Sequence, residues 1–181
     1  MANSKVTLTQ DRLKELLHYD PETGVFTWLP RPRSNFISSS SYGAWNARYA
    51  GKTAGVSTHG YRKISIDDQK HYAHRLAWLY MTGQWPTSLV DHKNETGSDN
   101  RWSNLRLATK STNGSNRRAA CADNKLGFRG VVAYKNKYVA QCHVGKGPHY
   151  IGLFNTPEEA HAAYARTLNE RVGEFSPYFG E

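Results

Sequence analysis

Cysteine is scarce in this sequence. The 181 residues include only Cys121 and Cys142, and no C-x-x-C pair occurs. This excludes a disulfide framework and a cysteine-rich zinc knuckle. Long apolar runs are also missing: no stretch of about 18 apolar residues is present, which excludes a membrane-spanning helix, and the first ten residues lack the apolar core of a signal peptide. We therefore expect a cytoplasmic protein that is not secreted and has no membrane partner.

Acidic residues are outnumbered. Lys and Arg total 24 against 15 Asp and Glu, and the isoelectric point is about 9.6. Such an excess favours polyanionic partners, because each neutralised phosphate releases condensed counterions. Composition alone is equally compatible with a basic protein that binds no nucleic acid. The length suits one ordinary domain or two small ones, and 5 Trp, 11 Tyr and 6 Phe can build small cores in spite of a mean hydropathy of −0.72.

The N-terminal part alternates between helical and extended patterns. Leucines at helical spacing predict a helix over Leu8–His18 with Thr9 as its N-cap. A turn at Asp20–Gly24 leads into a strand at Val25–Trp28. Residues 31–49 are rich in Ser, Asn, Arg and aromatics without clear periodicity. We interpret them as a long loop or arm, and no role is predicted for residues 31–50.

The middle of the chain predicts a hairpin followed by a helix. Gly60–Ile66 and Lys70–Tyr72 flank the pair Asp67-Asp68, a pattern typical of a β-hairpin. Residues 73–81 then have the pattern of a short helix that ends near Gly83.

Charge divides the last third of the chain. Residues 116–146 carry seven basic residues against one acidic residue, a net charge of +6, whereas residues 147–181 carry two basic residues against five glutamates, a net charge of −3. The basic part contains two predicted strands, Phe128–Val132 and Lys137–Val144, and Tyr150–Phe154 is a third. A helix should follow as far as Arg171, because Thr156-Pro-Glu-Glu159 is a capping box with proline at the first helical position.

The helix predicted after Thr156 carries a single apolar face, formed by Ala160, Ala163, Tyr164 and Leu168. We therefore predict a three-stranded antiparallel sheet covered by one helix, with positive charge concentrated on the sheet. This arrangement suits a sheet that enters a DNA groove, although a charge run is more often only a solvated face.

Four polar residues of the central segment have the chemistry that phosphodiester hydrolysis needs. His92 has the intrinsic pKa of a base near neutrality. Asp91 and the amide oxygen of Asn113 are hard ligands suited to Mg²⁺ or Mn²⁺. Asn104 is placed to accept the other ring N–H of His92 and so to fix its tautomer. Taken alone, Asp91 and His92 are more often turn and surface residues, and neighbours on a regular strand point to opposite faces, so they can share a site only at a strand end or distortion.

Five short blocks in order resemble the HNH endonucleases. They are H-R-L at residues 74–76, V-D-H at 90–92, N-L-R at 104–106, A-T at 108–109 and N-x-x-N at 113–116. The resemblance covers about residues 60–118 and implies a strand–strand–helix (ββα-metal) core. It also implies that His92 is the general base, that Asn104 orients it, and that Asp91 and Asn113 bind one metal ion.

One residue departs from the usual HNH motif, and the expected metal ion and branch of the family depend on it. Asn113 stands where many members carry the last histidine of the motif, which resembles the phage homing-endonuclease branch. We therefore expect one Mg²⁺ or Mn²⁺ per active site and regard zinc as less suitable. His74 is interpreted as structural, and the basic residues Arg75, Lys93, Arg106 and Arg117 as contacts to the DNA backbone.

A second resemblance covers about residues 124–175. The segments Gly127–Val131, Tyr138–Ala140, Ile151–Phe154 and Thr156–Tyr164 look like the plant ethylene-response-factor DNA-binding domain. That family has three strands packed on a helix and contacts the major groove from its sheet. The resemblance implies DNA contacts from Arg129, Lys135, Lys137, Gln141 and His143.

Together these features predict an α+β chain: N-terminal antiparallel hairpins and an HNH nuclease domain over residues 1–118 (core about 60–118), a linker at 119–123, and the sheet-and-helix domain at 124–181. The resemblances imply a phage-type, free-standing, site-specific nuclease for double-stranded DNA, active in the cytoplasm of a bacterial host.

Several points stay open. One site per chain favours nicking by a monomer, and cutting both strands would need a dimer or a second binding event. A DNA-binding regulator without nuclease activity is the alternative function. An RNA-directed nuclease has little support, because no strand carries the aromatic stacking pattern of single-strand RNA readers.

Overall fold

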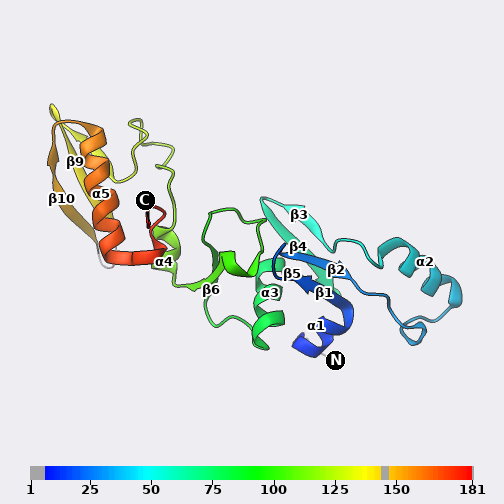
Figure 1. The fold of residues 1–181 in the computed structure, drawn as a ribbon. Helices are drawn as coiled ribbons and strands as arrows, with labels where there is room; N and C mark the ends of the chain where they lie inside the picture. The colour runs from blue at the N-terminus through cyan, green and yellow to red at the C-terminus, as the bar shows by residue number, and fades with distance from the viewer. Residues whose placement is uncertain (1–6, 144–146, 181) are drawn as a thin grey trace, which may run out of the picture. The chain divides into compact units, whose positions relative to one another are not determined.

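A computed structural model of the chain describes residues 7–143 and 147–180, and its contacts divide the protein into two compact units (Figure 1). The first unit comprises the chain up to His92 together with Thr96–Leu107, and the second comprises Lys93–Glu95 and the chain from Ala108 onwards. Each has its own hydrophobic core. Within the described ranges, no helix combines the length and apolar character needed to cross a membrane.

The first unit begins with a helix that leads directly into a hairpin. Helix α1 (Gln10–Leu16) starts where predicted, with the Thr9 hydroxyl accepting from the N–H of Arg12. It ends two residues before the predicted His18, because strand β1 (Leu17–Asp20) pairs antiparallel with β2 (Val25–Trp28). Leu17 and Tyr19 are thereby buried as alternate residues of a strand.

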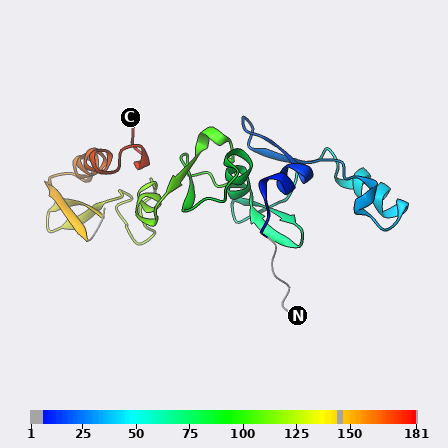
Figure 2. The same ribbon diagram turned by 90° about the horizontal axis from the view of Figure 1, so that it is seen from below.

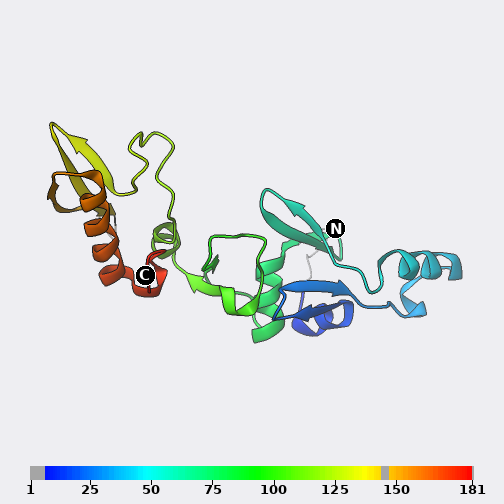
Figure 3. The same ribbon diagram turned by 45° about the horizontal axis from the view of Figure 1, so that its top comes forward.

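The segment predicted as a loop or arm contains helices. A 3-10 helix, η1 (Arg33–Asn35), precedes α2 (Ser39–Tyr49), which is closed at its start by a capping box between Ser38 and Ser41. Helical periodicity was absent from the sequence because α2 has no buried face: none of its residues is buried. In all three views α2 lies at the end of its unit, joined to β2 and β3 by two connecting segments (Figures 1, 2 and 3).

The predicted hairpin and the helix after it are confirmed. Strands β3 (Val56–Thr58), β4 (Tyr61–Ile66) and β5 (Gln69–Tyr72) form an antiparallel sheet. Asp67 and Asp68 form its tight turn with φ of 45° and 60°, which aspartate tolerates better than most residues. Helix α3 (Ala73–Thr82) follows and ends at Gly83 in the left-handed conformation.

Strand, strand and helix then follow in the predicted order. Strands β6 (Leu89–His92) and β7 (Leu105–Ala108) form a two-stranded sheet, and the 3-10 helix η2 (Trp102–Asn104) lies between them in sequence. Strand β7 begins directly after η2, whose last residue is Asn104. Helix α4 (Lys110–Ser115) is capped by Thr109. Strands β6 and β7 belong to the first unit except for Ala108, and α4 belongs to the second.

The second unit contains the predicted three-stranded antiparallel sheet, in the order β10-β9-β8. Strands β9 (Lys137–His143) and β10 (Pro148–Phe154) lie close to their predicted positions, except that Val144, the predicted end of β9, is outside the described residues. The prediction for β8 was wrong by three residues at its start. It runs from Val131 to Tyr134, because Gly130 has a φ of +76° and the preceding residues form a turn.

Helix α5 (Pro157–Val172) covers one face of this sheet and is followed by the 3-10 helix η3 (Gly173–Phe175) (Figure 1). The four predicted core residues of α5 are all buried, which confirms the amphipathic pattern. Thr156 is the N-cap as predicted, but the Glu159 carboxylate accepts from the N–H of Asn155, where a capping box would use Thr156. The opposite face of the sheet carries Lys137, Gln141 and Tyr150.

Candidate active site

The two adjacent residues Asp91 and His92 lie at the end of strand β6. His92 is the last residue of the strand, and both side chains are buried, with 7% of Asp91 and 5% of His92 exposed. Neighbouring residues can share one site at the end of a strand, where the regular alternation of side chains stops. Asp91 and His92 lie at such an end.

A hydrogen bond to Asn100 defines the tautomer of His92. The Asn100 amide nitrogen donates to the carbonyl of Ser98, so its oxygen Oδ1 faces Nε2 of His92 at 3.2 Å. An amide oxygen only accepts, so Nε2 carries the proton in this network. The basic nitrogen of the neutral ring is therefore Nδ1.

The loop that carries Asn100 is braced by the N-terminal hairpin. The Tyr19 hydroxyl donates to the Asn100 carbonyl at 2.7 Å, and the N–H of Trp102 donates to the carbonyl of Pro21 at 2.9 Å. Gly24, at the turn of the hairpin, has a φ of +72°, and a Cβ there would lie 2.4 Å from the backbone of Asn100 and Arg101. Only glycine permits this approach, so the hairpin contributes directly to the placement of Asn100.

Aromatic rings surround the other side of His92. The ring centroids of His74 and His92 lie 5.0 Å apart, and Tyr61 lies 6.0 Å from His92. Tyr72 stacks on His74 at 5.3 Å. Burial lowers the pKa of His74 to about 4, and burial likewise lowers the pKa of His92, against the opposing effects of Asn100 and Asp91. Both rings are therefore neutral at pH 7.

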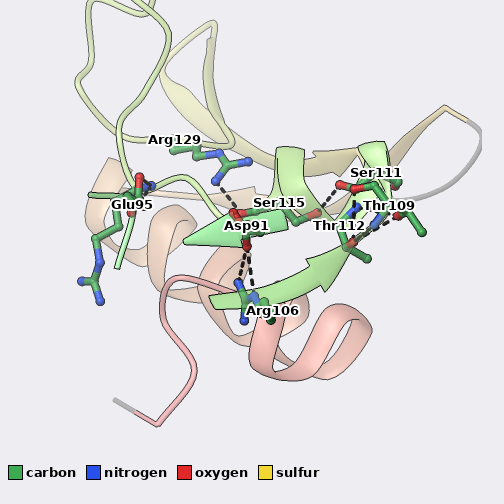
Figure 4. A network of polar contacts seen from close by, with 9 residues as sticks. Asp91, Glu95, Arg106, Thr109, Ser111, Thr112, Ser115 and Arg129 are labelled. Carbon is green, nitrogen blue, oxygen red and sulfur yellow. Dashed lines mark hydrogen bonds and ion pairs between the residues drawn. The ribbon is translucent and has the colours of Figure 1, made fainter. Parts of the chain in front are cut away.

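Asp91 forms a buried ion pair with Arg106 of strand β7 (Figure 4). Nε and Nη2 of Arg106 both lie 2.9 Å from Oδ2 of Asp91. Arg106 is only 8% exposed. The sequence predicted a contact from Arg106 to DNA. The structure places its guanidinium against the carboxylate, where the ion pair fixes the orientation of both side chains.

Asn104 and Asn113 occupy different surroundings. Asn104 is buried, and its amide nitrogen donates to the Asp99 carbonyl at 2.8 Å. Its predicted contact with the ring of His92 stays a prediction. Asn113 is an exposed residue of α4, in the second unit, whereas Asp91 is in the first. Their shared role as metal ligands therefore rests on sequence spacing.

Short-range and long-range contacts both hold helix α4. A capping box joins Thr109 and Thr112 at its start (Figure 4). At its end, the guanidinium of Arg129 donates to the carbonyls of Gly114 and Ser115, both at 2.9 Å. Helix α4 contacts η3 and α5. The helix that carries Asn113 is thus anchored to the sheet-and-helix domain.

The donor set predicted for a metal ion is a carboxylate and an amide. In residues 7–143 and 147–180, no three His, Cys, Asp or Glu side chains are grouped so as to hold a metal. Asp91 and Asn113 offer hard oxygen atoms, which suit Mg²⁺ or Mn²⁺ with water and phosphate in the remaining positions. The buried Asp91 carboxylate has the chemistry to bind such an ion.

The residues predicted to contact DNA differ in accessibility. Five of them are exposed: Lys93, Arg117, Lys135, Lys137 and His143. Gln141 is half-buried on the sheet face that α5 leaves uncovered. Arg75 is half-buried, and its guanidinium lies 5.8 Å from the Trp85 ring centroid. Arg129 is engaged with the carbonyls of α4.

Sequence reasoning missed Asn100 and Tyr61 near His92. Asn100 belongs to a loop rich in Asn, Ser, Asp and Gly, where an asparagine is expected for its turn propensity alone. Its burial, with 2% exposed, is the sign of a specific role, and that sign is visible only in the structure.

Comparisons with known proteins agree with this geometry in part of the chain. Residues 71–115 match the HNH endonuclease family. Over 115 residues the chain is 33% identical to an uncharacterised HNH endonuclease of Acanthamoeba polyphaga mimivirus, an alignment that covers 62% of this chain and 59% of the viral protein. The chain thus spans less than two thirds of that relative. No solved structure matches significantly.

Proposed function

We propose that this protein is a metal-dependent, site-specific DNA endonuclease of the homing type, built on an HNH core. The observation that carries the proposal is the environment of His92. It is a buried, neutral histidine next to Asp91, oriented by Asn100 and located within the segment that is similar to HNH endonuclease.

His92 acts as the general base. Nδ1 takes a proton from a water molecule as the water oxygen attacks the phosphorus atom, while the Nε2–H bond to Asn100 keeps the ring in the productive tautomer. The lowered pKa keeps the ring unprotonated at neutral pH, so it is ready to accept a proton. Asn104 is proposed to assist in orienting the ring.

Asp91 and Asn113 would hold one Mg²⁺ or Mn²⁺. When bound, such an ion supplies positive charge that stabilises the phosphorane and the leaving oxygen. Arg106 fixes the direction of the Asp91 carboxylate. Lys93 and Arg117, both exposed, are proposed to bind the DNA backbone, and Arg75 is proposed to assist them.

The sheet β10-β9-β8 is proposed to be a DNA-binding module of the ethylene-response-factor type. Its uncovered face presents Lys137, Gln141 and His143, and Lys135 lies at the β8–β9 turn. A basic sheet face of this kind suits the major groove, where base edges can be read. It would supply sequence preference to a nuclease core that recognises phosphate.

The test is cleavage of supercoiled plasmid and of a fragment of the source genome by the full chain with Mg²⁺ or Mn²⁺. His92→Ala should lower the cleavage rate at least 100-fold, as expected for loss of a general base, with DNA affinity almost unchanged. His18→Ala, which removes an exposed histidine of β1, is the matched control and should cleave normally.

Two results would contradict the proposal. Cleavage by His92→Ala at the parental rate would exclude His92 as the base. A parental protein that binds DNA but leaves the plasmid supercoiled with either metal would be a DNA-binding regulator. Mapping both strand ends on the fragment distinguishes nicking from a double-strand cut.

A further inference from the structure

Residues 29–52, which we call the arm, have the composition of an interaction surface. They contain four basic residues and no acidic one. Helix α2 buries none of its residues, and Ile37 is fully exposed. A helix without a buried face gains little stability from its own unit, and exposed apolar side chains among positive charges indicate a partner.

The arm is nevertheless fixed at its base. The N–H of Trp28 donates to the carbonyl of Lys52 at 3.0 Å, and the N–H of Gly51 donates to the carbonyl of Trp28 at 2.8 Å. Farther along, the Asn46 side chain bonds to both backbone groups of Arg31, at 2.9 and 3.0 Å. The arm therefore presents its side chains from a defined position on the first unit.

A cavity of about 510 Å³ lies where the arm meets strands β3 and β4. Three aromatic rings and two basic side chains line it, together with the exposed Val56: Trp28, Trp45, Tyr49, Arg31 and Lys63. The rings of Trp28 and Trp45 are nearly perpendicular at 5.7 Å, and those of Trp45 and Tyr49 are tilted at 5.2 Å. No acidic residue is among the residues that line it.

Arg31 brings a desolvated cation to this cavity. Its guanidinium carbon lies 4.1 Å from the ring centroid of Trp45 and 5.4 Å from that of Trp28. Its Nε is buried, and no group in the described part of the chain accepts a hydrogen bond from it. A partly buried guanidinium that stacks on indole is well suited to bind a phosphate group beside a flat ring.

We infer that this cavity binds an unpaired nucleotide of the DNA substrate, with its base stacked against Trp45 and Tyr49 and its phosphate bound by Arg31. The ligand must be unpaired, because the faces of paired bases are covered by their neighbours in a duplex. Proteins usually bind single-stranded DNA in this way: aromatic side chains stack on the bases, and basic side chains bind the phosphates of the DNA backbone. The inference rests on the proposed function, since it assumes that DNA is the substrate.

The experiment measures binding by the full chain without metal, so that no probe is cut. Two duplexes of equal sequence are compared, one fully paired and one with a single extra, unpaired 2-aminopurine. We expect the parental protein to prefer the second duplex and to change its 2-aminopurine fluorescence. Trp45→Ala should weaken binding of that duplex about tenfold, the usual value of one stacked base, and Trp45→Phe should restore most of the affinity.

The matched control is Tyr42→Ala, which removes an aromatic ring of the same helix that packs on Phe36 outside the cavity. It should bind both duplexes as the parental protein does. Circular dichroism of each variant establishes that the chain is folded.

Three results would overturn the inference. If Trp45→Ala binds the unpaired probe as tightly as the parental protein does, the cavity is not the nucleotide site. The proposed function stands in that case, provided that the parental protein still cuts DNA. Failure of the parental protein to bind any DNA rejects both. A dimer of the parental protein that dissociates in Trp45→Ala, measured by sedimentation without DNA, would assign the cavity to a second copy of the chain.

Discussion

At the scale of single residues, the arrangement around His92 suits the role of base proposed for this buried histidine. A buried imidazole without hydrogen bonds would have no fixed tautomer. The contact with Asn100 provides one, and the packing of His74 and Tyr61 restricts ring rotation. In the proposed mechanism, the side chain of Asn100 shares the orienting role that the sequence pattern assigned to Asn104.

The first prediction concerns Asn100. Asn100→Ala should lower kcat about 10- to 100-fold, the usual effect of losing a partner that orients a catalytic imidazole, while the affinity for DNA stays unchanged. Asn100→Asp keeps an oxygen acceptor for Nε2 and should recover part of the rate. Single-turnover cleavage and DNA binding without metal measure the two effects. An Asn100→Ala enzyme with parental kcat would show that the contact is dispensable.

The second prediction concerns the acid stability of the first unit. Because the pKa of His74 is lowered from its ordinary 6.5 to about 4, the unfolded chain binds a proton between these values that the folded chain does not. The free energy of unfolding should therefore fall as pH decreases from about 6.5 to 4, by at most about 3 kcal/mol from this residue.

The variant His74→Phe tests this directly. It keeps an aromatic ring in contact with Tyr72 and removes the titrating group, so its unfolding free energy should depend less on pH in this window. Urea unfolding at several pH values measures the dependence. Identical pH dependence in the two proteins would show that His74 does not titrate as proposed.

At the scale of elements, two segments far from each other in sequence support the site. The hairpin β1-β2 packs its turn against the backbone of Asn100, and Arg129 binds the end of α4. The positions of Asn100 and α4 are thus fixed by residues that are distant from them in sequence. Arg129, predicted from the sequence to contact DNA, bonds to the backbone of α4.

The third prediction concerns Arg129. Arg129→Ala removes two hydrogen bonds from a charged donor to the carbonyls of Gly114 and Ser115, so α4 should open more readily. Amide exchange in residues 110–115 should accelerate about tenfold, which hydrogen exchange with mass spectrometry measures. Arg117→Ala removes the same charge from an exposed neighbouring position and should leave the exchange of α4 unchanged. Equal exchange in both variants would contradict the anchoring role.

At the scale of the whole molecule, charge is distributed unevenly. The net charge of the chain is +9, and the basic residues around β8 and β9 contrast with residues 147–181, whose net charge is −3. A sheet with one face packed on a helix has its other face available for a partner. The arm adds a second basic surface in the first unit.

The fourth prediction concerns the salt dependence of DNA binding. If Lys137 contacts a phosphate, Lys137→Ala should reduce the slope of log K against log salt concentration by about 1. Arg166→Ala, which removes an exposed positive charge from α5, should leave the slope unchanged. Titrations of one duplex at several salt concentrations measure both slopes. Equal slopes for Lys137→Ala and the parental protein would remove Lys137 from the interface.

The sequence by itself determined the features that depend on local chemistry. Thr9 and Thr156 begin helices because a hydroxyl accepts the unpaired N–H groups of a first turn, and Asp67-Asp68 turns because aspartate tolerates positive φ. The apolar face of α5 followed from spacing in the same way. These features each depend on residues a few positions apart.

Only the tertiary structure decided the features that depend on distant partners. Strand β1 replaces the end of the predicted helix because Leu17 pairs with Trp28, and helix α2 forms without a pattern of its own. Asn100 was not predicted because the residues that place it, Tyr19 and Gly24, precede it by more than 70 positions. Propensity and spacing carry no information on such contacts, since they arise when segments pack.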